Sequence, residues 1–139
     1  MSARSFATAR LMETWAHGQD VWDAVHRTRP VTARLLHIAQ LGVITFRWSF
    51  LNRGLAIPAM PPVVELEGPG GTVWRWGDDP TAGSLRGPAL DFCLVVTQRR
   101  HFLDTALTLE GTVAGQWMSI AQCFAGPPAE GPPPGTFAR

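Results

Sequence analysis

The spacing of apolar residues predicts two long helices in the first part of the chain. Over residues 2–25 the apolar side chains recur at helical intervals on one broad face, and Ser2 or Ser5 can cap the first turn. Over residues 31–53 the pattern is again helical, but apolar residues surround nearly the whole circumference. A helix of this kind needs neighbours on more than one side. Residues 1–57 therefore predict a helical hairpin with more apolar surface than two helices can cover.

The pattern changes after a proline-rich joint at residues 58–62. Residues 63–67 and 72–76 alternate with the period of two that is typical of strands, on either side of a Gly-Pro-Gly-Gly turn. The rest of this part predicts a loop, a helix, a strand and a last helix, over residues 78–87, 89–100, 105–110 and 112–124. We therefore expect an α+β fold, in which a small antiparallel sheet with two helices, residues 63–125, follows the helical hairpin.

The final segment and the composition limit the classes of protein that fit. Residues 126–139 are rich in proline and glycine, so we expect this tail to be extended or disordered. The chain has a formal net charge of +1 and is 45% hydrophobic, which is globular composition without the basic excess of a nucleic-acid-binding protein. The most apolar run, residues 35–51, is too polar to span a membrane. Since no secretory leader is recognisable, we expect a cytoplasmic protein without nucleic-acid or membrane partners.

A candidate metal site lies on the first predicted helix. Glu13 and His17 are four residues apart, so their side chains project from one helix face about one turn apart and can reach one divalent ion. Asp20 lies on the same strip, where it could be a third ligand or could orient the His17 ring by accepting its second N–H. The same residues also suit a solvated helix face with a Glu–His ion pair. Spacing alone leaves both interpretations open.

Other reactive side chains have structural explanations. Cys93 and Cys123 lie inside apolar helical stretches, where we expect buried free thiols rather than a disulfide. His37 faces a mostly apolar helix and is interpreted as a core or interface residue. His26 and His101 lie at predicted helix ends, where a cationic ring suits the helix dipole. The candidate chemistry therefore concentrates on the Glu–His helix.

Parts of the sequence resemble a known family. The segment ARLMETWAHGQDV, residues 9–21, resembles the last metal-bearing helix of DinB-like proteins related to mycothiol-dependent maleylpyruvate isomerase. The runs GPALDFCLVVTQRR (residues 87–100) and WMSIAQCFAGPP (residues 117–128) resemble the sterol-carrier-protein-like domain that follows the bundle in an actinobacterial branch. The resemblance implies that the hairpin is the remnant of a four-helix bundle. In that bundle a Glu-x-x-x-His pair, matched here by Glu13 and His17, holds a divalent metal together with one earlier histidine.

The resemblance also implies that one ligand is missing. In such proteins the helix with the first histidine precedes this segment, whereas this sequence begins almost at the Glu–His helix. We therefore expect a truncated bundle. Four outcomes are open for its Glu13–His17 pair. The pair could bind a divalent metal, with zinc as the expected ion, weakly by itself, with help from Asp20, or with ligands from a second copy. It could also bind no metal at all. Mycothiol is implied as the thiol by resemblance alone.

Arg99 is a candidate catalytic residue by the same resemblance. In the isomerase relatives an Asp-led apolar helix ends in Gly-Arg, and the arginine faces the active site; the stretch from Asp91 to Arg99 has the same length, with Gln98 in place of the glycine. Such an arginine could hold a substrate carboxylate by a two-pronged hydrogen bond. In that case Arg99 points back toward His17. The alternative is that Arg99 only offsets the dipole of its own helix.

Two functions fit these observations. The first is a metal-binding protein of the DinB-like, maleylpyruvate isomerase type, derived from a metal-dependent thiol transferase or isomerase that acts on a small molecule. The second is a non-catalytic module, in which the sterol-carrier-like part binds a small ligand and the helices mediate oligomerisation. Because the helices carry excess apolar surface, we expect either a homodimer or a missing N-terminal half of the bundle as the partner.

Overall fold

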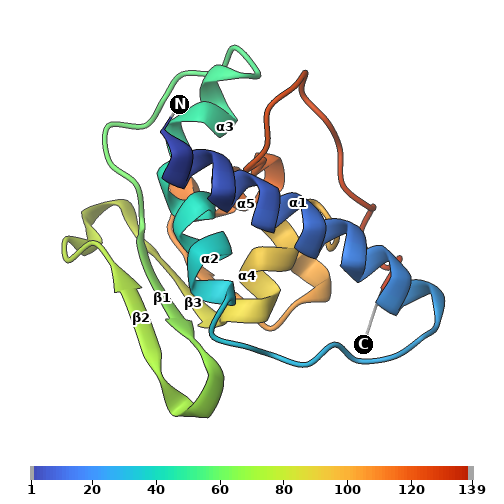
Figure 1. Cartoon of the computed structure of the whole chain (residues 1–139). Helices are drawn as coiled ribbons and strands as arrows, with labels where there is room; N and C mark the ends of the chain where they lie inside the picture. Colours follow the sequence, from blue (N-terminus) through green and yellow to red (C-terminus); the bar gives the residue numbers. More distant parts are fainter. Residues whose placement is uncertain (1, 138–139) are drawn as a thin grey trace.

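A computed structural model describes residues 2–137, and it has the α+β fold that the sequence predicts (Figure 1). Three helices come first, and two more are interleaved with four strands. Helices α1 to α5 span Ala3–Ala24, Leu35–Ile44, Phe46–Leu51, Ala89–Val96 and Thr112–Ile120, and strands β1 to β4 span Val63–Glu67, Val73–Trp76, Ser84–Pro88 and Thr108–Glu110. No helix in this described part of the chain is long and apolar enough to cross a membrane.

The four strands form one mixed sheet in the order β2-β1-β3-β4. Strands β1 and β2 form the predicted antiparallel hairpin. The prediction of a purely antiparallel sheet is wrong, because β3 runs parallel to β1 and places Leu85 beside Val64. Strand β3 also begins within residues 78–87, which we expected to be a loop. Its single aliphatic residue among Ser, Arg, Gly and Pro is too weak a local signal for a strand, and its pairing with both β1 and β4 makes it one.

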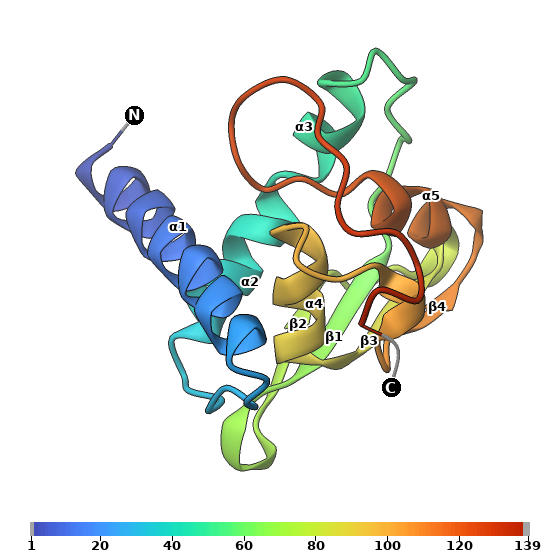
Figure 2. The same cartoon turned by 90° about the vertical axis from the view of Figure 1, so that its right-hand side faces the viewer.

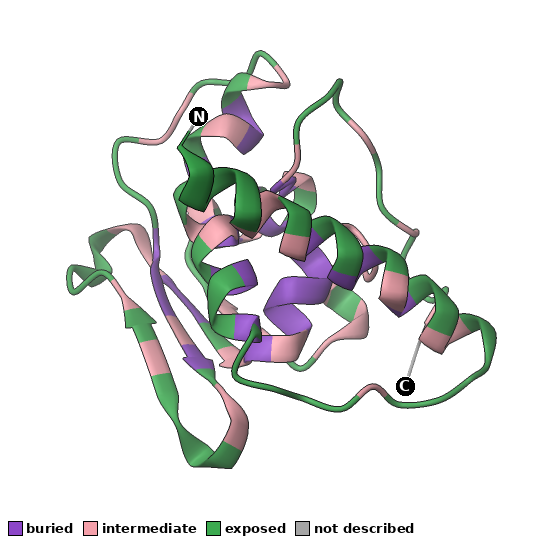
Figure 3. Cartoon of the chain, in the orientation of Figure 1, coloured by how far each residue is buried: buried purple, intermediate pink, exposed green. Residues whose placement is uncertain are grey.

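Helix α4 lies at the centre of the hydrophobic core (Figure 2). Seven of its eight residues are buried, and α2 packs directly against it (Figure 3). Trp117 of α5 receives two aromatic rings edge-on, from Phe46 of α3 at 5.0 Å and from Phe92 of α4 at 5.8 Å between centroids. One apolar cluster therefore joins the early helices, the sheet and α5.

The first predicted helix is confirmed, and the second is divided. Ser2 caps α1, because its hydroxyl oxygen accepts a hydrogen bond from the Ser5 N–H. The expected helix over residues 31–53 begins only at α2 and is then split from α3 at Thr45. The Thr45 hydroxyl donates to the Leu41 and Gly42 carbonyls in the preceding turn, at 2.8 and 3.0 Å, and this back-bonding is a known cause of bends in helices.

The later helices are shorter than their patterns predict. The third was expected over residues 89–100, but α4 ends at Val96. Gln98 has a left-handed φ of 59°, a conformation that commonly ends a helix. The last was expected over residues 112–124, but α5 ends at Ile120 and the chain continues in extended form. Beyond α5 the side chains of Ala121 and Cys123 remain in the core, which is why the apolar pattern outlasts that helix.

The tail is packed against the protein over its described residues. Arg53 binds it twice, through the Glu130 carboxylate at 2.9 Å and the Ala129 carbonyl at 2.6 Å. Near the end, the Asp104 carboxylate accepts a hydrogen bond from the Gly135 N–H at 3.0 Å. The tail thus has no helix or strand up to residue 137, and it ends in a turn over residues 134–137, where the Thr136 N–H donates to the Pro133 carbonyl. Residues 138 and 139 lie outside the described part of the chain.

Candidate functional site

Helix α1 has one face in the core and one face in solvent. Met12, Trp15, Ala16 and Gln19 are its buried residues, and they lie on a single side of the helix. Glu13 lies on the side that faces solvent. Residues that follow it at intervals of three or four positions lie on the same side. The helix runs across the outside of the molecule, where no other element of the described chain covers this second face (Figure 1).

Glu13 and His17 are open to solvent at the middle of this second face. Both residues are exposed, and the His17 side chain keeps 76% of its accessible surface. The nearest carboxylate oxygen of Asp20 lies 3.8 Å from His17 Nδ1. The three residues therefore form the strip that their spacing predicts. Glu13 and His17 can present an oxygen and a nitrogen donor to the same incoming ion.

Arg99 contacts Asp20 on this strip, and its guanidinium already has hydrogen-bond partners. Its Nε and Nη2 donate to the two carboxylate oxygens of Asp20, both at 3.2 Å. Its Nη1 donates to the Thr97 carbonyl at 2.8 Å, which lies at the end of its own helix. Arg99 thus makes one contact of each kind. Its contact with Asp20 crosses to α1, as the functional interpretation requires, and its contact with Thr97 lies at the end of α4, as the alternative requires. Its catalytic role stays a prediction.

A second arginine pair, which the sequence analysis missed, lies one turn further along α1. Arg100 Nη2 and Nη1 donate to the Asp23 carboxylate at 2.6 and 2.9 Å. Gln19 Nε2 donates to the same carboxylate at 3.0 Å. These hydrogen bonds, chiefly those from Arg100, lower the pKa of Asp23 below its ordinary value despite the opposing effect of burial. The sequence did contain a signal for the two arginine–aspartate contacts. Asp20 and Asp23 are three residues apart on one helix, and the two arginines are consecutive.

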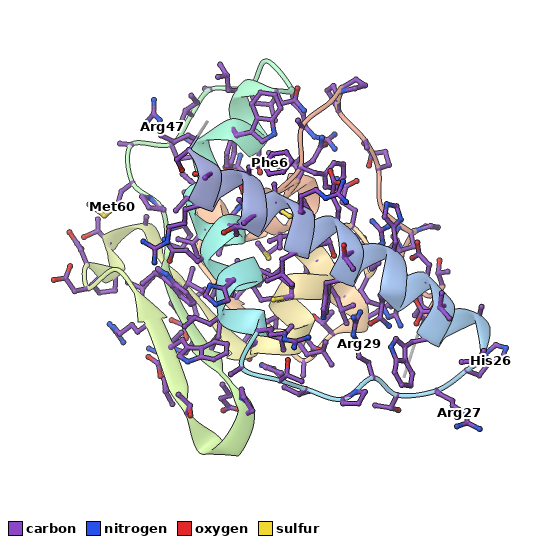
Figure 4. All side chains as sticks on the ribbon, in the orientation of Figure 1. Phe6, His26, Arg27, Arg29, Arg47 and Met60 are labelled. Carbon is purple, nitrogen blue, oxygen red and sulfur yellow. The ribbon has the colours of Figure 1, made fainter. Side chains whose placement is uncertain are left out.

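Arg29, on the loop between α1 and α2, holds the buried side of α1. Its guanidinium lies over the Trp15 ring, 4.5 Å from the centroid, and its Nη1 donates to the Trp15 carbonyl at 2.7 Å. Figure 4 places Arg29 beneath the helix and Phe6 near its N-terminal end. Burial lowers the pKa of the Arg29 guanidinium. The contacts of Arg29 below α1 therefore hold the helix in place.

The donor set of this face is incomplete for a metal centre. Glu13 and His17 are two potential donors, and the Asp20 carboxylate is shared with Arg99. Across residues 2–137 there is no group of three His, Cys, Asp or Glu side chains placed to hold a metal ion. Structural and catalytic zinc sites use at least three protein ligands. The face therefore has fewer donors than such a site uses.

The cysteines and the other histidines lie apart from this face. Cys93 and Cys123 are buried free thiols, as predicted; burial raises the pKa of both, that of Cys123 to about 12. His37 is exposed on α2, so its interpretation as a core residue is wrong and only the interface alternative remains. His101 Nδ1 accepts a hydrogen bond from the Leu103 N–H, which is a local turn contact. None of these residues adds a donor to Glu13 and His17.

Comparison with known proteins finds relatives whose names assign no function. The chain is 52% identical over 131 residues to an uncharacterized protein of Mycobacterium tuberculosis, in each of two strains. The match covers 94% of this chain and 51% of those proteins, so the chain spans about half the length of the curated relatives it matches. No protein-family model matches the chain, and no solved structure matches it significantly.

Proposed function

We propose that α1 contributes two ligands, Glu13 and His17, to a divalent-metal site whose remaining ligands come from outside this chain. The observation that carries the proposal is the placement of both side chains in solvent, one turn apart, on the helix face that the core does not use. A carboxylate and an imidazole at this spacing suit zinc. The two donors would bind the ion weakly by themselves.

The apolar residues around the pair support a missing covering element. Phe6 and Val21 lie on the same outer side of α1 and are 59% and 64% exposed. They lie fifteen positions apart along the helix, so a partner packed along this side would cover both and bury their apolar surface. Further helices of a bundle, packed on this side, would bury them and bring additional donors to Glu13 and His17. The extra length of the curated relatives leaves room for such helices.

Arg99 would then hold the anionic part of a substrate at the edge of the metal site. Its two-pronged contact with Asp20 has the geometry by which arginine binds carboxylates. A substrate carboxylate would compete with Asp20 for that guanidinium. By resemblance, the whole protein would be a cytoplasmic metal-dependent thiol transferase or isomerase of the maleylpyruvate isomerase type, with mycothiol as its thiol. The metal would supply Lewis-acid activation of a bound thiol or water.

Zinc titration of the purified chain by calorimetry tests the two-ligand proposal. We expect weak binding of about one zinc ion per chain, abolished by the double substitution Glu13→Ala, His17→Ala. The double variant Glu67→Ala, His37→Ala is the matched control, because it removes one exposed carboxylate and one exposed imidazole elsewhere. Unchanged binding by the first variant, or equal loss in the control, contradicts the site.

Exposed apolar residues on a second surface favour another candidate function, a non-catalytic oligomerisation module. Ile44 of α2 and Leu51 of α3 are 64% and 61% exposed. A homodimer formed through the helices would cover such residues without any metal. Light scattering at micromolar concentration distinguishes the candidates. A metal-free dimer that the variant Ile44→Ser, Leu51→Ser converts to monomer favours the module, whereas a monomer excludes it.

A further inference from the structure

A small cavity on the opposite side of the core from α1 has a chemical character that the metal proposal does not use. Its volume is about 250 Å³, and it lies between α2, the loop before β1, the end of β2 and α5. Its apolar lining consists of Val43, Met60, Pro61, Pro62, Trp76 and Trp117. Met60, on the loop before β1, projects from the edge of the molecule (Figure 4). We call this space the tryptophan cavity.

The two indoles of the tryptophan cavity are held in fixed positions. Trp117 is buried and is packed edge-on by Phe46 and Phe92. Trp76 Nε1 donates a hydrogen bond to Gln40 Oε1 at 2.6 Å, which sets the orientation of its ring. A ligand that enters the cavity therefore meets the partly exposed ring of Trp76 and the small part of Trp117 that reaches the cavity wall, and binding does not have to order either ring first.

The charges at the tryptophan cavity are all of one sign. Asp78 and Asp79 belong to its lining, and none of the described residues that line it is basic. Asp79 accepts hydrogen bonds from the N–H and the hydroxyl of Thr81, and these bonds favour its ionised form and lower its pKa. At neutral pH the cavity thus combines apolar walls, aromatic π-systems and two carboxylates.

From these features we infer that the tryptophan cavity binds a small organic cation with a methylated ammonium group. Such a cation is attracted electrostatically to the faces of aromatic rings, most strongly to Trp, and its methyl groups replace water on apolar walls. The carboxylates of Asp78 and Asp79 supply the counter-charge. The volume suits a trimethylammonium group with a short substituent. An anion would meet only repulsion here, and a neutral apolar ligand would make no use of the carboxylates.

A nuclear magnetic resonance titration of the whole chain with choline tests this site. The readout is the set of six tryptophan indole N–H resonances, of which those of Trp76 and Trp117 should move. The neutral ligand 3,3-dimethylbutan-1-ol has nearly the same shape without the charge. We expect choline to bind about tenfold more tightly than this alcohol, as cation–π and carboxylate contacts together predict.

Two double variants separate the charge effect from a general loss of structure. Asp78→Asn, Asp79→Asn should weaken choline binding about fivefold or more and leave the binding of the alcohol unchanged. Glu67→Gln, Glu110→Gln removes two exposed carboxylates elsewhere and should change neither. Equal affinity for choline and the alcohol overturns the inference, and so does an absence of shifts at Trp76 and Trp117 at tens of millimolar choline. The inference does not depend on metal binding, since the Glu13→Ala, His17→Ala variant should bind choline normally.

Discussion

Helices α1 and α4 both pack against α2, but different interactions hold them in place. Helix α4 has seven buried residues out of eight, and its contacts are almost entirely apolar. Helix α1 has four buried residues out of 22. Its C-terminal half is attached by the arginine contacts to Asp20 and Asp23 and by the stacking of Arg29 on Trp15.

This difference suggests separate roles for the two helices. Helix α4 specifies the fold, whereas α1 can exchange its polar contacts. Apolar burial is non-directional and scales with area, so α4 is held by many small contributions at once. Ion pairs near the surface each contribute little and can be exchanged for other polar partners. A helix attached in the second way can present a functional face without disturbing the core. The proposed metal ligands lie on that helix.

The largest expected effect comes from the same truncation made in each region. Phe92→Ala removes a fully buried ring from α4 and should reduce the free energy of unfolding by about 3–5 kcal/mol. Phe6→Ala on the outer face of α1 should change it by less than about 0.5 kcal/mol. Urea denaturation of both variants measures the contrast. Similar losses would mean that the outer face of α1 is covered in solution.

Glycine substitutions compare packing density at the contact of α2 with α4 and on α1. A Cβ at Gly42 would lie 2.8 Å from a ring carbon of Phe92 and 2.9 Å from a methyl group of Val96. We expect Gly42→Ala to lose about 1–3 kcal/mol through overpacking. A Cβ at Gly18 in α1 would meet only the end of the Arg29 side chain, at 3.2 Å. Gly18→Ala should therefore be neutral or gain up to about 1 kcal/mol from helix propensity, in thermal or urea denaturation.

The Asp23–Arg100 pair should be the stronger of the two arginine contacts. Both side chains are mostly buried, with 17% and 15% of their surface exposed. Asp23→Asn should reduce stability by about 1–3 kcal/mol, since it leaves the guanidinium without its counter-charge. Added salt should change the size of this loss little, because salt hardly screens a pair that is mostly buried. A loss below that of Asp20→Asn would reverse the ranking.

Acid titration gives an independent measure of the same contact. Because the pKa of Asp23 is lower in the folded protein than its ordinary 3.8, its contribution to stability is fully present above that value. The contribution is lost as pH falls through the lowered folded pKa. The stability difference between the wild-type protein and Asp23→Asn should therefore be constant near neutral pH and shrink below pH 3.8. A difference that persists in strong acid would exclude the ionic contribution.

The smaller effect of the two arginine contacts is expected at Asp20, on the proposed functional face. Asp20 is 56% exposed, so Asp20→Asn should cost less than about 1 kcal/mol. The same variant should leave weak zinc binding by Glu13 and His17 largely intact, because the Asp20 carboxylate is directed at Arg99. Calorimetry and urea denaturation report the two effects separately. A complete loss of zinc binding would make Asp20 a true third ligand.

Much of the local structure follows from sequence-adjacent interactions. The start of α1 depends on Ser2 and Ser5, and the hairpin of β1 and β2 on a four-residue turn. The exposure of Glu13 and His17 also follows from helical periodicity, because one face of α1 carries the apolar residues. In each case the residues that determine the local structure lie within a few positions of one another. The local sequence is therefore enough to predict that structure.

The pairings between distant residues could not be derived in this way. Strand β3 has a weak local pattern and exists because β1 and β4 supply hydrogen-bond partners on both sides. Arg100 and Asp23 are 77 positions apart, and nothing in either neighbourhood selects one acidic partner over another. The docking of the tail through Arg53 and Glu130 depends equally on the folded surface that receives it.

The sequence by itself therefore determined the α+β class, the positions of most helices and strands, and the outward direction of the Glu13–His17 pair, because periodicity and turn chemistry act locally. Only the tertiary structure decided the parallel pairing of β3, the occupation of Arg99 by Asp20, and the tryptophan cavity. These features arise where separate segments meet. Their energies depend on distances and desolvation across the fold, which spacing along the chain does not encode.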